Sequence, residues 1–149
     1  MLIAIALHVL AVVVWVGGMG FMLFMLRPGL APLPPAERLG VLARVLTRFL
    51  PAVGAAVVVI AVTGGWLMSL YGGMRNTPWG VHVMVALGVV MILVYAWIIV
   101  RLNPRMQAAV RTGDLPSAAT LAERIRRYVV LNFVLGVVVI LAAIVGRGG

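Results

Sequence analysis

The sequence predicts an all-α integral membrane protein, a four-helix up-down-up-down bundle with both termini on the outer (periplasmic) side. Hydrophobic residues make up 64% of the 149 residues and charged residues only 10%, whereas a soluble domain carries about 25% charged residues. Four apolar runs each reach the ~20 residues that a membrane-spanning helix needs. They use nearly the whole chain, so we expect a single domain over residues 1–149.

The expected spans cover about residues 2–26, 49–71, 79–100 and 128–145, and none contains Asp, Glu, Lys or Arg in its interior. The first run is too long for the core of a signal peptide and lacks a basic segment before it, so we interpret it as a retained helix. Helical patterns also precede the second and fourth spans. These two helices are therefore expected to begin in the membrane interface.

The turn between the second and third spans is short. Gly72 and Gly73 are expected to end the second helix, because glycine is the preferred residue after a helix C-terminus. Thr77 is expected to cap the third helix, with Pro78 at its first position. Short connections between successive spans favour the up-down-up-down order.

The placement of arginine predicts the orientation. The chain has twelve arginines and no lysine, and ten arginines fall on one side of the expected spans: Arg27, Arg38, Arg44, Arg48, Arg101, Arg105, Arg111, Arg124, Arg126 and Arg127. Only Arg75 and Arg147 fall on the other side. Positive loops remain cytoplasmic, so both termini should face outward from a bacterial inner membrane. The alternative role for these loops is binding of anionic lipid headgroups or an acidic partner.

Several classes of function are excluded or weakened. The basic residues flank spans, so nucleic acid is not expected as a partner despite the net charge of +9. Cysteine is absent, which removes thiolate ligands and thiol nucleophiles. The spans also lack a carboxylate or lysine that could serve as a dedicated acid or base, or line a polar ion pathway. Whether the protein is an enzyme stays open at this point.

The two histidines of the chain, His8 and His82, both lie inside expected spans. His8 lies about 9 Å below the outer end of the first span and His82 about 6 Å below that of the third. At a common depth, two neutral imidazoles are good ligands for haem iron or copper, and bundle cores commonly hold such sites. The plain alternative is that each ring only donates a hydrogen bond to a backbone carbonyl or a Ser/Thr hydroxyl.

The neighbours of the histidines favour haem b or copper in different ways. Trp15 lies on the His8 face of the first helix and would form one wall of an apolar slot for a porphyrin. The haem propionates would pair with Arg75 or Arg147, whose alternative role is interfacial anchoring. Copper would favour soft sulfur donors, and the methionines toward the outer end are Met68, Met74 and Met84. Methionine is also an ordinary apolar filler.

The motifs resemble a known family. They are H-V-L-A-V-V-V-W-V-G-G-M-G-F-M-L-F-M-L-R-P from His8 to Pro28, P-P-A-E-R-L from Pro34, R-F-L-P from Arg48, V-H-V-M from Val81, A-V-R-T-G-D from Ala109, I-R-R from Ile125 and G-R at Gly146. In this order they resemble the small, stand-alone members of the CopD family, named for a copper-resistance membrane protein. The resemblance implies a four-helix core with His8 as a candidate ligand. That family often has His-x-His where this chain has Gly80 before His82.

The sequence leads to three hypotheses about function. The first is a membrane redox protein that binds one b-type haem through His8 and His82 and transfers electrons between a quinone, or a redox partner protein, and an outer acceptor. The second is a copper-binding or copper-uptake protein of the CopD type that uses the same histidines. The third is porphyrin oxidation, because the His8 to Trp15 spacing also resembles the first helix of HemJ proteins, which bind a b-type haem. Further expected partners are the lipid bilayer and a second copy of the chain.

Overall fold

The computed structural model describes residues 1–146, and their regular structure is helical. The first helical unit comprises α1 (Leu2–Val12), the π-helical turn η1 (Val13–Gly17), α2 (Gly18–Phe21), the π-helical turn η2 (Met22–Leu26) and α3 (Arg27–Leu30). The second is α4 (Pro35–Leu70), which is followed by the short 3₁₀ turn η3 (Met74–Asn76). The third comprises α5 (Trp79–Trp97), the π-helical turn η4 (Ile98–Leu102) and α6 (Asn103–Thr112), and the fourth is α7 (Leu115–Val145).

Within residues 1–146, four helical units are long and apolar enough to cross a membrane, which confirms the predicted all-α membrane fold. Each predicted apolar run overlaps one of them, and only the second run extends past its helix, by one residue at Tyr71. The helices continue past the runs at the ends where arginine is frequent. The 36 residues of α4 make a helix about 54 Å long, against about 30 Å for the hydrocarbon core of a bilayer. The second and fourth helices therefore have the lead-in segments that the sequence predicts.

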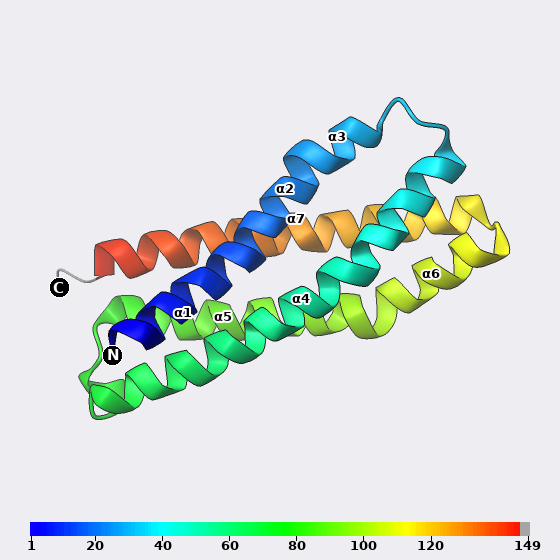
Figure 1. Ribbon diagram of the computed structural model, residues 1–149. Helices are drawn as coiled ribbons and strands as arrows, with labels where there is room; N and C mark the ends of the chain where they lie inside the picture. Colours follow the sequence, from blue (N-terminus) through cyan, green and yellow to red (C-terminus); the bar gives the residue numbers. More distant parts are fainter. Residues whose placement is uncertain (147–149) are drawn as a thin grey trace.

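The four helical units run alternately up and down (Figure 1). At one end lie the N-terminus, the turn between α4 and α5 and the end of α7, and we call this the terminal end. The other end holds the loops between α3 and α4 and between α6 and α7, and we call it the arginine-rich end. The first helical unit crosses α7 obliquely, with contacts to α7 from η1, α2 and η2.

Glycines end the helices at two turns. Gly72 and Gly73 follow α4 with φ angles of 78° and 99°, and the N–H of Gly73 donates to the Met68 carbonyl at 3.2 Å. Gly113 follows α6 with φ of 75°. Glycine adopts this left-handed conformation without the Cβ penalty of other residues. The prediction that Gly72 and Gly73 end the second helix is in line with this geometry.

The predicted cap of the third helix is wrong. The Thr77 hydroxyl donates to the carbonyl of Met74 at 2.7 Å, so it closes η3 and does not cap α5. Pro78 occupies the N-cap position, and the helix begins at Trp79. Thr77 thus lies one residue before the N-cap, and no side chain caps the first turn of α5.

Burial differs between the two halves of the bundle. We define the terminal half as residues 1–12, 57–90 and 137–146, and the arginine-rich half as residues 13–56 and 91–136. The described buried residues of the terminal half are all small or polar: Ala4, Ala11, Thr63, Thr77, Gly80 and Gly146. The arginine-rich half buries the large side chains, among them Trp15, Leu46 and Met106. Most of the hydrophobic core therefore lies in the arginine-rich half.

Two polar side chains join helices near the middle of the bundle. The Tyr95 hydroxyl of α5 donates to the Leu50 carbonyl of α4 at 2.9 Å. The buried amide of Asn132 on α7 donates to the Met91 carbonyl of α5 at 3.0 Å. The Asn132 Oδ1 atom has no hydrogen-bond partner among residues 1–146. An interhelical hydrogen bond of this kind stabilises a membrane bundle by about 0.6 kcal/mol on average.

Candidate functional site

His8 lies on the face of the first helical unit that packs inward. Ala4, Ala11 and Trp15 are buried on the same face, because residues three to four apart share one side of a helix. The His8 ring is half-buried and faces α4, where its Nδ1 atom lies 2.9 Å from the Thr63 Oγ1 atom. The packing of α1 on α4 positions this side chain in the terminal half.

Thr63 determines which ring nitrogen of His8 is free. Its hydroxyl donates to the Val59 carbonyl at 2.6 Å, so its oxygen is left to accept the hydrogen bond from the ring. Nδ1 then carries the proton, and Nε2 keeps its lone pair. Histidine ligands in metalloproteins are commonly oriented in this way, with one ring nitrogen bonded to a protein acceptor and the other directed to the metal. The described geometry thus offers Nε2 as a ligand atom.

Gly64 leaves space for the His8 ring, because it has no side chain. A Cβ atom at this position would lie only 3.3 Å from the His8 Cε1 atom, which is tighter than an ordinary van der Waals contact. The imidazole therefore packs directly against the backbone of α4. Thr63 and Gly64 were not among the site residues predicted from the sequence. A usable signal is the polar T-G-G triplet at residues 63–65 within an apolar run.

His82 has different surroundings. It is exposed, and its Nδ1 atom lies 3.2 Å from the Pro78 carbonyl of the same helix. Gly80 is buried against α7, and two residues further on a side chain points about 200° around the helix. His82 thus lies on the face of α5 that turns away from α7. The Nδ1 atoms of both histidines thus make the hydrogen bonds expected if the rings have only a structural role, to a hydroxyl at His8 and to a backbone carbonyl at His82.

The structure does not connect the two rings directly. No hydrogen bond among residues 1–146 joins His8 to His82, and each ring contacts a different partner. Within the same residues, no group of three or more His, Asp or Glu side chains is close enough to hold a metal ion. Ligation of one iron or copper ion by His8 and His82 together stays a prediction.

The other predicted site residues lie in separate places. Trp15 is buried and packs edge-to-face on Tyr95, with 6.4 Å between the ring centroids, so its ring contributes to the core. Arg75 is exposed in η3, and Arg147 lies outside the described residues. Met68, Met74 and Met84, the methionines considered as sulfur donors for copper, are each half-buried.

Comparison with protein-family models identifies the family of the chain. The family model "Copper resistance protein D" matches residues 43–145, more than two thirds of the sequence. The chain belongs to the CopD family. The predicted resemblance is thereby confirmed, and this CopD protein is a multi-pass membrane protein of a family associated with copper resistance. No similar protein was found among curated proteins or among solved structures. The family assignment supports the copper hypothesis better than the haem hypothesis.

The CopD match contains His82 and Thr63, while His8 precedes it. At Gly80, the first position of the His-x-His pattern that the sequence resemblance implied, an added Cβ atom would lie 2.5 Å from the Ala142 carbonyl oxygen. Backbone atoms cannot yield as a flexible side chain can, so α5 and α7 approach too closely here for any side chain. A site built on histidines at both positions is therefore not formed in this CopD protein.

Proposed function

We propose that this protein binds copper at the outer end of a four-span bacterial inner-membrane domain, with the Nε2 atom of His8 as the principal ligand, and that it takes part in handling or uptake of the ion. The observation that supports this most is the hydrogen-bond chain from His8 Nδ1 to Thr63 Oγ1 and on to the Val59 carbonyl. It orients a half-buried imidazole with its second nitrogen free.

The proposed orientation gives copper access to this site. Ten of the twelve arginines lie at or near the arginine-rich end, and arginine-rich loops remain in the cytoplasm. The terminal end, with His8, His82 and the turn between α4 and α5, then faces outward. An ion arriving from outside would meet His8 within the outer part of the membrane.

The available donors suit copper in transit. Imidazole nitrogen and thioether sulfur are both good ligands for copper, and thioethers select Cu(I). Met68, Met74, Met84 and the exposed His82 belong to the same end of the bundle as His8. Within residues 1–146, no group of three or more His, Asp or Glu side chains could hold a metal ion. A site with few such ligands favours entry and release of an ion over permanent storage.

Haem b has less support as a cofactor. The haem hypothesis requires both imidazoles on one iron, but His82 lies on the face of α5 that turns away from α7 and is bonded within its own helix. Trp15, the expected wall of the porphyrin slot, is packed against Tyr95 instead. Electron transfer to a quinone and the HemJ-type reaction both depend on such a haem, so they rank below copper handling.

The test is a copper titration of the purified protein in lipid nanodiscs against a chromophoric Cu(I) chelator. We expect His8→Ala to weaken copper binding at least 100-fold. Thr63→Val should weaken it about 10- to 100-fold through loss of the hydrogen bond that orients the ring, and Thr63→Ser should restore most of the affinity. His82→Ala should have the smaller effect of the two histidine variants.

Thr47→Val is the matched control for Thr63→Val. The Thr47 hydroxyl on α4 also donates to the carbonyl four residues back, at 3.0 Å, but Thr47 is not hydrogen-bonded to an imidazole. Its substitution should leave copper affinity unchanged. Equal copper affinity in wild type and His8→Ala would overturn the proposal. A reducible haem spectrum that disappears in both His8→Ala and His82→Ala would establish the haem hypothesis in its place.

A further inference from the structure

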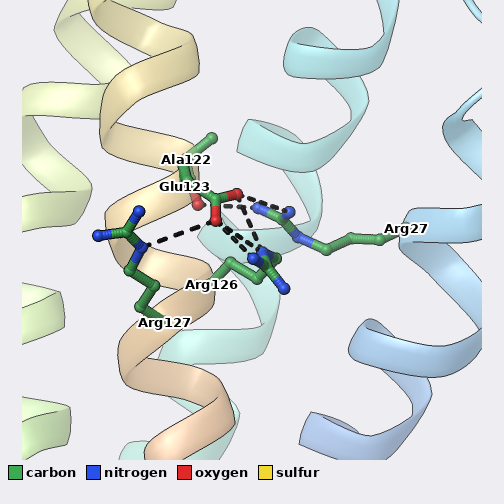
Figure 2. A network of polar contacts seen from close by, with 5 residues as sticks. All are labelled: Arg27, Ala122, Glu123, Arg126 and Arg127. Carbon is green, nitrogen blue, oxygen red and sulfur yellow. Dashed lines mark hydrogen bonds and ion pairs between the residues drawn. The ribbon is translucent and has the colours of Figure 1, made fainter.

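A cluster of charged side chains joins the first and last helical units near the arginine-rich end (Figure 2). Arg27 of α3 reaches across to α7, where its Nη2 atom donates to the Ala122 carbonyl at 2.8 Å. Glu123 receives three hydrogen bonds from Arg126, at 2.6 Å, 2.9 Å and 3.0 Å, and lies within 4 Å of both Arg27 and Arg127. Three guanidinium groups thus face one carboxylate, which leaves an excess of positive charge.

A groove of about 420 Å³ begins at this cluster. Arg27 and Arg126 line it together with apolar side chains from both helices, Phe24, Val130, Phe133 and Val134. The first helical unit and α7 cross obliquely (Figure 1), so the two helices diverge on the side of α3. The groove therefore combines cationic groups with apolar walls.

The aromatic part of the wall is well supported. Phe24 and Phe133 meet edge-to-face with 5.5 Å between their ring centroids. A Cβ atom at Gly20 would lie 3.1 Å from the Phe133 ring, so this glycine allows the ring to approach the first helical unit. Phe24 is nevertheless 61% exposed. The wall is thus fixed in position and still available to an apolar ligand.

We propose that this groove binds one anionic phospholipid, with its phosphate on Arg27 and Arg126 and an acyl chain along Phe24 and Val134. Guanidinium groups bind phosphate oxygens through short, charge-assisted hydrogen bonds. Arg27 directly follows the first apolar run, which is the level where lipid phosphates lie when a helix spans the bilayer. A free phosphate ion would leave the apolar walls uncovered, and a lipid covers them. The proposal does not depend on copper binding.

Native mass spectrometry of the full chain tests the proposal. The protein is equilibrated in detergent with equal amounts of phosphatidylglycerol and phosphatidylcholine of the same acyl chains. We expect one phosphatidylglycerol to be retained about tenfold more than phosphatidylcholine. Arg126→Gln should remove most of this preference, because it deletes a cation of the groove and leaves the Arg27 bond to Ala122 in place. Phe24→Ala should lower retention of phosphatidylglycerol without raising retention of phosphatidylcholine.

Arg111→Gln is the matched control, because Arg111 is exposed on α6 near the same end and does not line the groove. It should leave the preference unchanged. Equal retention of the two lipids in wild type would overturn the proposal, as would equal losses from Arg126→Gln and Arg111→Gln, which would indicate a diffuse charge effect. Displacement of phosphatidylglycerol by millimolar inorganic phosphate would identify a phosphate site in place of a lipid site.

Discussion

The two halves of this bundle use the same four helical units differently. The arginine-rich half buries large side chains such as Leu46, Met106 and Trp15, whereas the described buried residues of the terminal half are glycine, alanine and threonine. Close packing of large side chains gives a helix bundle one fixed arrangement. The comparison indicates that the arginine-rich half holds the bundle together, while the terminal half depends on close backbone contacts.

This difference fits the position of the proposed site. A copper ligand must keep one ring nitrogen accessible, and dense packing of large side chains around His8 would cover it. Thr63 and Gly64 hold the ring with a hydrogen bond and a flat backbone surface. Functional segments are commonly found in the less stable part of a fold. On the proposed function, the structural and chemical tasks lie in opposite halves of the same helices.

The largest expected effect on stability comes from substitutions in the core of the arginine-rich half. Leu46→Ala and Met106→Ala remove nearly fully buried side chains and should each lower the free energy of unfolding by about 2–5 kcal/mol. Leu7→Ala in the terminal half is the control, because Leu7 is 47% exposed. Unfolding by increasing sodium dodecyl sulfate in mixed micelles measures the difference. Similar losses at Leu7 and Leu46 would contradict the division into two halves.

A smaller effect is expected at the backbone contact of the terminal half. Gly80→Ala places a Cβ atom against the Ala142 carbonyl oxygen, and such overpacking typically costs about 1–3 kcal/mol. Gly88→Ala, on the same helix, would meet none of the described atoms within 4 Å and should stabilise α5 slightly, since alanine favours helix over glycine. The same unfolding assay compares the two variants. Equal stability of both would argue against the close α5–α7 contact.

A third variant sharpens the comparison by separating stability from function. Gly64→Ala should displace the His8 ring, whose Cε1 atom would lie 3.3 Å from the new methyl group, and weaken copper binding about tenfold, as loss of ligand orientation does. Gly65→Ala is the control, because its Cβ atom would meet none of the described atoms within 4 Å. In copper titration and unfolding assays, the two variants should differ in copper affinity but have the same free energy of unfolding.

The sequence was sufficient for the fold because the information is local. An apolar run without charged residues predicts a membrane span independently of where the other spans lie. The Gly72–Gly73 pair ends a helix by its own conformational preference. The predicted Thr77 cap was wrong by one residue, because Pro78 takes the N-cap position and α5 begins at Trp79. Local patterns therefore predict elements well and predict their ends less reliably.

The site was harder to predict because it depends on helix rotation. His8 and Thr63 are 55 residues apart, and a shift of one residue turns a side chain by about 100° around its helix. Equal depth therefore did not show whether His82 would face His8. The bond between Arg27 and Ala122 joins residues 95 apart. From the sequence, this arginine was assigned a role in orientation, with binding of lipid headgroups or an acidic partner as the alternative for the basic loops as a whole.

The smallest expected effect lies outside the packed core, at the turn before α7. Asp114 caps this helix by accepting a hydrogen bond from the Ser117 N–H at 3.2 Å. Hydrogen bonds from Ser117 lower the pKa of the exposed Asp114 carboxyl below its ordinary value. A lowered pKa in the folded state means that the ionised form stabilises the fold. This contribution is complete above the ordinary Asp pKa of about 4 and is lost as pH falls through the lower folded value.

Asp114→Asn tests this contribution, since asparagine keeps a capping oxygen but does not titrate in this range. Wild type should be slightly more stable than Asp114→Asn at neutral pH, because a charged acceptor makes the stronger hydrogen bond. The advantage should disappear on acidification through the folded pKa of Asp114. Thermal unfolding of both proteins in the same detergent measures this difference from about pH 7 to about pH 2, a range that extends well below the ordinary Asp pKa. A constant difference across that range would show that the carboxylate charge at the helix start does not contribute to stability.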